Sequence, residues 1–406
     1  MTYEIMAPVG SREAFAAALK AGADSIYFGI ESHSASKFTI EDLHDIAAQC
    51  EEKGVKSYLT VNTIIYGEDL ALMRKICDAA KEAKISAVIA ADVAVLSYCR
   101  TINQEVHLST QLNISNEEAL RFYSAFADVV VLARELNMEQ VRKIADFIEE
   151  NQIKGPNGEL IRIEMFCHGA LCMAVSGKCY LSLDNQGRSA NRGQCMQQCR
   201  RKYTVKDKET GVELDIDNEY IMSPKDLKTI GFIDKMMAAG VSVFKIEGRA
   251  RSAEYVYTVV QCYKEAIQAV QDGTYSEEKV KAWDERLATV FNRGFWDGYY
   301  QGKKLGEWTD KNGSSATEKK EYVAKGTKYF SKLGVAEFLV EAGEINLGDK
   351  LVVIGPTTGV VYIDVTSMHG DNGPVEKATK GMSVAFPVSE KVRPSDKLYK
   401  LVKTDN

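Results

Sequence analysis

Residues 164–203 read EMFCHGALCMAVSGKCYLSLDNQGRSANRGQCMQQCRRKY, and the rest of the chain is organised around them. An apolar run over residues 161–166 leads into this stretch and predicts a β-strand. The residues that follow are too rich in Gly, Asn, Ser and Gln for an ordinary helix. Long ordered loops are uncommon inside compact domains and are usually functional. We therefore expect a functional loop over residues 167–203, inserted into a regular fold.

Four cysteines of this loop have the spacing C-x6-C-x15-C-x3-C, which is typical of metal ligands. Thiolate sulfur is a soft donor, and four thiolates suit a tetrahedral zinc ion or an iron–sulfur cluster. The tight C-x2-C pair of most structural zinc sites is missing, which favours iron–sulfur. The alternative is a set of incidental thiols, although cytosolic chains rarely cluster cysteine without a metal or redox reason. A fifth cysteine, Cys167, lies on the predicted strand and is expected to be a packing residue.

Two blocks of this stretch resemble a known family. The pattern E-x-F-x2-G-A-L-C-x4-G-x-C-x-L-S covers residues 164–182, and N-R-G-x-C-x3-C-R covers residues 191–200. Both are similar to signatures of the peptidase U32 family, the collagenase-like peptidases, and the resemblance extends from residue 1 to about residue 310. It implies a TIM barrel and a 4Fe–4S cluster. By motif position, the cluster ligands are Cys172, Cys179, Cys195 and Cys199.

The resemblance also implies chemistry. Several branches of the family are oxygen-independent hydroxylases, acting on the tRNA wobble uridine at C5, on a ribosomal RNA cytidine or on the ubiquinone ring. In the wobble-uridine branch, the implied hydroxyl donor is prephenate, a dicarboxylate.

The composition is that of an ordinary globular protein. The 406 residues, 45% hydrophobic and 27% charged, are enough for one large domain and a smaller one. No run approaches the roughly 20 apolar residues of a membrane span, and the N-terminus does not resemble a secretion signal. We therefore expect a cytoplasmic protein whose nine cysteines are reduced. Because the net charge is −6, a nucleic-acid partner would have to bind a local basic patch.

Strand and helix patterns alternate over the first 270 residues. Eight strands that are continuous apolar runs predict a parallel sheet covered on both faces, and eight units over about 250 residues suit a (β/α)8 barrel. An open doubly wound sheet is the alternative, but only Gly10 follows the first strand, without a G-x-G-x-x-G turn. The predicted strands are residues 4–9, 25–30, 56–61, 87–91, 106–109, 129–133, 161–166 and 243–246. The predicted helices include residues 11–21, 40–53, 69–83, 117–124, 138–150, 227–239 and 253–270.

The pattern changes near residue 304. Residues 1–303 form the predicted catalytic domain, the polar segment 304–319 a linker, and residues 320–406 a small β-barrel domain. The phrase FLVEAGEINLGDKLVVIGPTTGVV, residues 338–361, resembles domain two of elongation factor Tu. Such modules often contact RNA or a neighbouring domain. The expected strands here are residues 334–341, 350–354, 359–366, 382–386 and 397–402.

Polar residues follow most of the predicted barrel strands. Active sites of TIM barrels lie where the strands end, although a polar residue at that position caps a helix about as often. The predicted catalytic residues are His168, Glu247, Arg249 and Arg134. The predicted substrate-binding residues are Tyr27, Asn62, Asp92, Thr110, Gln111, Arg188, Arg192 and Arg200.

Individual roles follow from side-chain chemistry. His168 suits a general acid or base, a further ligand or a hydrogen-bond donor to cluster sulfur, and a structural histidine is the alternative. Arg134 and Arg249 suit a carboxylate or phosphate, with a salt bridge at the rim as the alternative. The phrase KIEGR at residues 245–249 resembles a recurrent family phrase, which favours function for Glu247 and Arg249.

Residues 185–206 carry six basic side chains and no acid, which predicts a positive patch that guides RNA to the site. Neutralisation of an anionic cluster is the alternative explanation. The six residues are Arg188, Arg192, Arg200, Arg201, Lys202 and Lys206.

The leading hypothesis is an RNA-modifying hydroxylase that acts on tRNA, with prephenate or a similar carboxylate as a second ligand. A collagenase-like peptidase, a ring hydroxylase of quinone biosynthesis and a structural zinc protein are the alternatives. The peptidase motifs H-E-x-x-H and G-x-S-x-G do not occur in the chain.

Overall fold

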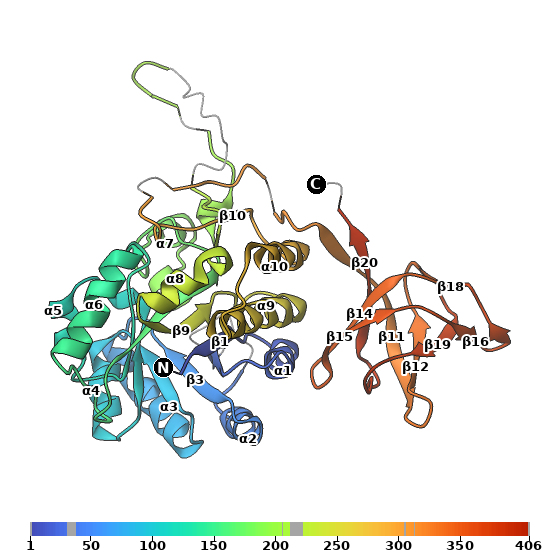
Figure 1. Cartoon of the computed structure of the whole chain (residues 1–406), viewed down its shortest axis with the longest axis horizontal. Coiled ribbons are helices and arrows are strands. Elements are labelled where there is room, and N and C mark those ends of the chain that lie inside the picture. Colours follow the sequence, from blue (N-terminus) through green and yellow to red (C-terminus); the bar gives the residue numbers. More distant parts are fainter. Residues whose placement is uncertain are drawn as a thin grey trace.

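The computed structural model describes residues 2–30, 38–204, 206–211, 222–303, 306–311 and 313–404. Within these residues, eight parallel strands pair in the order β1-β2-β3-β4-β5-β6-β7-β9, and β9 pairs with β1 to close a barrel (Figure 1). The predicted (β/α)8 barrel is therefore confirmed. The strands are β1 Glu4–Pro8, β2 Ser25–Phe28, β3 Lys56–Val61, β4 Ala87–Ala90, β5 Val106–Leu108, β6 Val129–Val131, β7 Arg162–Gly169 and β9 Val241–Ile246.

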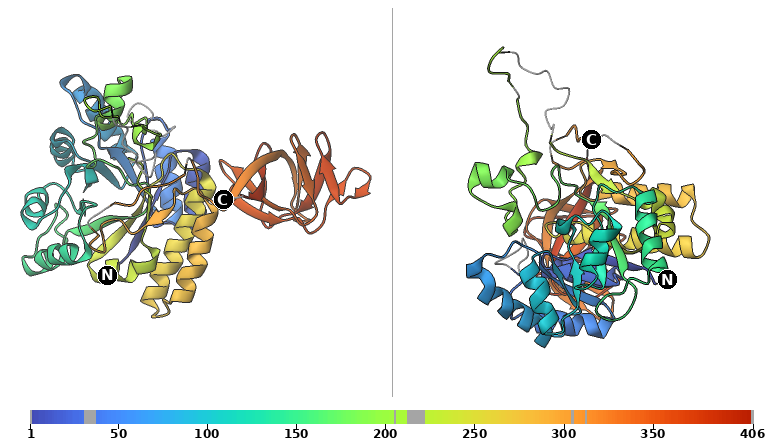
Figure 2. Two further views of the ribbon diagram at one scale, coloured as in Figure 1. Left: turned by 90° about the horizontal axis from the view of Figure 1, so that it is seen from above. Right: turned by 90° about the vertical axis from the view of Figure 1, so that its left-hand side faces the viewer.

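Helices surround the barrel and bury their apolar faces against the outer faces of the strands (Figure 2). The Ser11 side chain caps the first helix by accepting a hydrogen bond from the Ala14 N–H, as a serine before an amphipathic run predicts. The helices of this domain are α1 Arg12–Lys20, α2 Leu43–Lys53, α3 Leu70–Glu82, α4 Val93–Thr101, α5 Glu117–Tyr123, α6 Met138–Glu150, α7 Leu181–Gln186, α8 Ile233–Ala238, α9 Ala253–Gln271 and α10 Glu277–Thr289.

The predicted helix over residues 227–239 is wrong in its first half. That part of the chain forms a short strand, β8 (Asp226–Lys228), which runs antiparallel to the end of β7, and a 3-10 turn, Ile230–Phe232. The backbone N–H and the hydroxyl of Thr229 both donate to the Cys167 carbonyl, at 3.1 and 3.0 Å. These tertiary bonds hold the segment extended. A two-residue strand, β10 (Phe295–Trp296), then pairs with β8.

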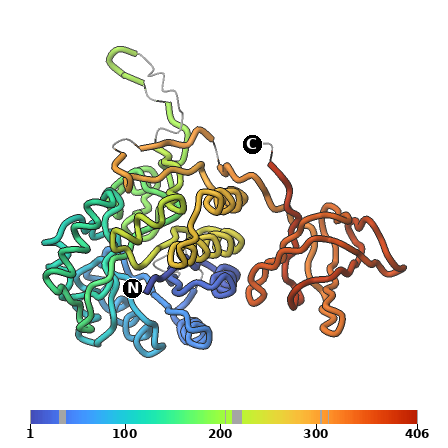
Figure 3. Tube along the Cα trace, in the orientation of Figure 1, coloured from blue at the N-terminus to red at the C-terminus, as the bar shows by residue number. Residues whose placement is uncertain are grey.

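The C-terminal domain is an antiparallel β-structure around its own core, and its trace is drawn beside the barrel in Figure 3. Its main sheet has the strand order β15-β14-β20-β11-β12-β19-β16-β17, and β13 and β18 form a separate ribbon. All five predicted strands are found. The strands are β11 Glu318–Phe330, β12 Val335–Val340, β13 Glu344–Asn346, β14 Lys350–Gly355, β15 Gly359–Asp364, β16 His369–Gly370, β17 Gly373–Pro374, β18 Lys377–Thr379, β19 Ser383–Pro387 and β20 Lys397–Lys403.

The longest of these strands, β11, is missing from the sequence prediction because its charged residues hide the alternation. It begins at Glu318, inside the predicted linker, whose residues 304, 305 and 312 lie outside the described part of the chain. The domain packs on the outer helices of the barrel. Ala17 of α1 and Ala253 of α9 form one apolar cluster with strand residues that include Val360, and Lys20 donates to the Val360 carbonyl at 2.7 Å.

In the part of the chain with assigned structure, no helix is both long enough and apolar enough to cross a membrane.

A close backbone approach fixes the position of the segment after β9. An ideal Cβ built on Gly10 would lie 1.8 Å from the Arg249 carbonyl oxygen, so no side chain fits between the end of β1 and this segment. We expect Gly10→Ala to destabilise the fold by about 2 kcal/mol, because inserting a methyl group forces the backbone apart. Thermal unfolding measures the loss. Gly67→Ala is the control, since nothing lies within 4 Å of a Cβ there, and an equal effect of the two substitutions would contradict the explanation.

Candidate functional site

A cavity of about 300 Å³ opens at the carboxyl ends of the barrel strands. Its walls come from strand ends and from the cysteine-rich loop after β7. Of the predicted substrate-binding residues, Tyr27, Asn62, Thr110, Gln111 and Arg200 line it. The predicted catalytic residues Arg134, Glu247 and Arg249 line it as well. The rim of the barrel and the loop therefore form one site.

All four predicted ligand cysteines line this cavity, namely Cys172, Cys179, Cys195 and Cys199. Desolvation raises the pKa of the Cys172 and Cys199 thiols, and the neighbouring thiols raise the Cys199 pKa further because like charges repel. A bound metal centre would reverse this balance by stabilising thiolates.

The donor set, four thiols that line one cavity, suits a thiolate-bound metal centre by its chemistry. No three His, Cys, Asp or Glu side chains in the described ranges lie close enough together to hold a metal ion. The thiols therefore share one cavity but would have to move closer to share one ion.

The basic residues of the loop differ in their contacts. Arg192 forms an ion pair with Asp69 and donates to the Ile64 carbonyl at 3.1 Å, which fastens the loop to the segment after β3. Arg200 donates to the Ser223 hydroxyl at 3.1 Å and also to backbone carbonyl groups. Both residues therefore hold the loop in place. Arg188 is exposed at the end of α7.

Cationic side chains dominate the barrel side of the cavity. The Arg134 guanidinium lies 3.8 Å from the centre of the Phe166 ring and donates to the Ala170 carbonyl at 3.2 Å. Arg249 donates to the Thr60 hydroxyl at 3.1 Å. Lys245 donates to Glu164 Oε1 at 2.7 Å. With Glu247 as the carboxylate among the lining residues, this surface suits an anionic ligand.

Neutral polar groups complete the wall. The Tyr27 hydroxyl donates to the Ile246 carbonyl at 2.9 Å, and burial raises its pKa well above the ordinary value, so it stays protonated. Asn62 donates to the Ser109 hydroxyl at 3.1 Å. The buried Thr110 hydroxyl has no hydrogen-bond partner among the described residues and is available to a ligand.

Besides Arg188 and Arg192, two more of the predicted site residues lie outside the cavity lining. The Asp92 carboxylate caps α4 through the Ala94 N–H at 2.9 Å and also accepts from the Ile65 N–H. His168 is buried on β7 and contacts the Tyr263 hydroxyl at 3.3 Å. Burial, with smaller effects of Lys228 and Arg251, lowers the His168 pKa to about 3. Both positions correspond to the structural alternatives of the sequence analysis. Cys167 is fully buried, as expected for a packing residue.

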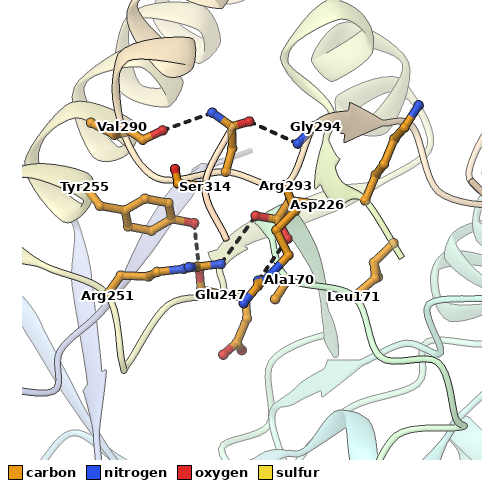
Figure 4. A network of polar contacts seen from close by, with 12 residues as sticks. Ala170, Leu171, Asp226, Glu247, Arg251, Tyr255, Val290, Arg293, Gly294 and Ser314 are labelled. Atoms are coloured by element: carbon orange, nitrogen blue, oxygen red, sulfur yellow. Dashed lines mark hydrogen bonds and ion pairs between the residues drawn. The ribbon is translucent and has the colours of Figure 1, made fainter. Parts of the chain in front are cut away.

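Sequence reasoning missed a polar network beside the cavity, shown in Figure 4. Buried Asp226 accepts from Arg251 at 3.3 Å and from Arg293 at 3.5 Å. Arg293 also donates to the Gln197 amide oxygen, between Cys195 and Cys199, at 3.3 Å. The network therefore links the segment between α10 and β10, which carries Arg293, to the cysteine loop. Its members lie in the short strand β8 and in irregular segments, where no periodic signal marks them.

Comparison with known proteins identifies the family. The sequence profile of peptidase family U32 matches residues 10–310. The chain belongs to peptidase family U32. A U32 relative named collagenase, from Porphyromonas gingivalis, is 66% identical over 99% of both chains. The tRNA hydroxylation protein P1 of Bacillus subtilis is 35% identical over 74% of this chain and 71% of its own. A 23S rRNA 5-hydroxycytidine synthase of Escherichia coli is 32% identical over 66% of this chain and 39% of its own.

The neutral, buried state of His168 has a consequence for acid stability. Because its pKa is about 3 in the folded chain and near 6.5 when unfolded, the unfolded state binds more protons between these values. His168 therefore costs up to about 1.4 kcal/mol of stability per pH unit as the pH falls through this window. We expect His168→Gln to flatten the pH dependence of the unfolding free energy between pH 6.5 and 3. Replacing the exposed His369 is the control. If the unfolding free energy of His168→Gln keeps the wild-type dependence on pH, His168 is not the group responsible.

Proposed function

We propose that this U32 protein is an RNA-modifying hydroxylase whose substrate is the wobble uridine of tRNA, hydroxylated at C5 without molecular oxygen. One observation carries the proposal: four thiols and a group of cations line the same cavity at the barrel mouth. U32 relatives named for tRNA hydroxylation and for 5-hydroxycytidine synthesis support the same class of chemistry.

The four cysteines would hold a 4Fe–4S cluster at the outer wall of the cavity, with zinc as the alternative metal. A cluster would supply electron transfer or Lewis acidity when bound. The residues of the chain provide the surroundings. Arg200 and Arg192 fix the loop that carries the thiols, and Gln197 donates its backbone N–H to the Cys195 sulfur at 3.4 Å.

Arg134 and Arg249 would bind the hydroxyl donor, a carboxylate such as prephenate. Guanidinium groups grip carboxylates with two parallel hydrogen bonds, and these two enter the cavity from different strand ends. Phe166 beneath Arg134 adds an apolar surface for a ring. A base of a single-stranded anticodon loop can enter such a mouth without opening a duplex. The exposed Arg188 and Arg201 lie on the same loop and suit RNA phosphates.

A peptidase is the second candidate, because the relative named collagenase is similar over nearly its whole length. A cysteine peptidase needs a base beside its thiol. No histidine is among the described residues that line the cavity, and His168 is enclosed elsewhere. These observations favour the hydroxylase.

The metal proposal predicts about four iron atoms per chain and a broad visible absorption band in protein purified without oxygen. Cys195→Ser should lower the iron content and the band, because each thiolate ligand bridges protein and cluster. Cys50→Ala is the control, since this buried cysteine of α2 is not among the residues that line the cavity. Stoichiometric zinc in place of iron would contradict the cluster.

The function predicts that a deletion strain loses one hydroxylated nucleoside, detected by mass spectrometry of total tRNA and rRNA. Wild-type protein and Cys50→Ala should restore the nucleoside, whereas Arg249→Gln should not, because the anionic ligand loses a cation. Loss of the nucleoside from rRNA alone would reassign the substrate. An unchanged profile, together with hydrolysis of gelatin by the purified protein, would favour the peptidase instead.

A further inference from the structure

Four titratable side chains form a line through the inside of the barrel. Lys245 Nζ on β9 lies 2.7 Å from Glu164 Oε1 on β7. Glu164 Oε2 lies 3.8 Å from His107 Nδ1 on β5, and His107 Nε2 lies 3.4 Å from Glu105 Oε1, just before β5. Lys245, Glu164 and His107 are 5%, 0% and 1% exposed. The line is therefore shielded from water over most of its length.

Each end of the line reaches a different cavity. Lys245 lines the site at the barrel mouth. Glu105, with a side chain 37% exposed, lines a second cavity of about 370 Å³ that also includes Asp128 and Asn157. Because Glu105 precedes β5 whereas the first cavity lies at the strand ends, the line connects opposite ends of the barrel.

Burying a line of titratable side chains inside a barrel costs folding free energy. TIM barrels fill this space mainly with branched apolar side chains, and part of the interior here is of that kind, with Ile89, Val129 and Val243. Buried charges are expensive unless they are paired and fully hydrogen-bonded. Lys245 and Glu164 are paired, but packing alone does not require the further connection to His107 and Glu105.

The contact between Glu164 and His107 is unusual. Glu164 Oε2 and His107 Nδ1 are both buried and have no hydrogen-bond partner among the described residues, yet they face each other. With the ring hydrogen on Nε2, next to Glu105, Nδ1 is an acceptor, so two acceptors oppose each other. One added proton between them satisfies both, which makes this pair a natural place for a proton in transit.

Two further polar side chains beside His107, those of Tyr58 and Glu4, are hydrogen-bonded to each other and lie outside this line. Tyr58 packs its ring 4.4 Å from the His107 ring and donates to Glu4 Oε1 at 2.7 Å. Although burial opposes it, Arg162, His107 and Lys56 lower the Glu4 pKa to about 2. Glu4 is therefore a permanent anion that balances Arg162, outside the line from Lys245 to Glu105.

We propose that Lys245, Glu164, His107 and Glu105 form a proton-transfer path between the cavity at the barrel mouth and solvent at the opposite end. Lys245, an ammonium group, passes a proton to Glu164 and then takes a replacement proton from the cavity. Glu164 passes a proton to His107 Nδ1 as the Nε2 proton moves to Glu105, and Glu105 releases it to water. One proton moves, no electrons move, and once the His107 ring proton has returned to Nε2 each group is in its starting state. The inference deepens the proposed function, because a proton released from a base carbon in this cavity needs a route to water.

The resting protein provides a test that does not depend on RNA activity. In full-length protein with ¹⁵N-labelled histidine, His107→Gln assigns the His107 signals among the five histidines. Lys245→Met removes the counter-charge of Glu164, so we expect the His107 Nδ1 resonance to move from the unprotonated to the protonated range. Lys245→Arg keeps the charge and should leave it unchanged. An identical His107 spectrum in Lys245→Met and in the wild-type protein overturns the path.

If Lys245→Met does not fold, Glu164→Gln replaces it. The amide group that Glu164→Gln introduces can donate to His107 Nδ1, and an unshifted Nδ1 resonance again overturns the path.

Turnover provides the second test. We expect single-turnover hydroxylation to be about 100-fold slower in Glu164→Gln and His107→Ala, with RNA binding unchanged. Added imidazole should restore His107→Ala, entering from the cavity beside Glu105, which a purely structural histidine would not allow. Tyr58→Phe is the control and should stay near the wild-type rate. If Glu164→Gln and His107→Ala both hydroxylate at the wild-type rate, the path is overturned. If the wild-type protein itself does not hydroxylate RNA, the proposed function is refuted, and the His107 spectrum alone then decides the path.

Discussion

Direct pairing of β7 with β9 is the constraint on which the rest of the structure depends. This pairing closes the barrel, so the chain between the two strands cannot enter the sheet as a further barrel strand. It leaves at the carboxyl end of β7, where TIM barrels place their active sites. The cysteine loop and β8 therefore lie against the mouth, and the thiols face the ends of the other strands.

Because β7 pairs directly with β9, the cysteine loop between them depends on side-chain hydrogen bonds to hold it against the barrel. A loop without strand pairing satisfies its backbone groups partly through turns and partly through side chains. Arg200 donates to the carbonyl of Leu171, Arg192 to that of Ile64, and Arg293 reaches Gln197. Arginines on and around the loop thus add side-chain hydrogen bonds where the loop has no strand pairing. The positive charge that the sequence suggested for RNA is partly used inside the protein.

The barrel interior combines two kinds of layer. Apolar residues such as Ile89 and Val243 pack in the middle, while paired charges occupy positions on the same inward faces. Charges in such a place are stable only with partners at hydrogen-bond distance. Lys245 and Glu164 meet that condition, and both lie on strands that close the barrel. The pairing that completes the fold therefore also brings a cation to the floor of the cavity.

The sequence by itself determined the barrel, because continuous apolar strands and amphipathic helices are local patterns that burial on two sides requires. It also pointed to the four cysteines that line the cavity and to most of the rim residues, since every parallel strand delivers its next residues to one end. It did not determine β8, whose extended form depends on the bonds of Thr229 to the distant Cys167 carbonyl. Nor did it predict that Lys245 and Glu164, two charged residues inside apolar runs, form an ion pair with each other. Only the tertiary structure decided that His168 is enclosed, that Asp92 caps a helix and that Arg192 and Arg200 fasten the loop, because each role is set by atoms far away along the chain.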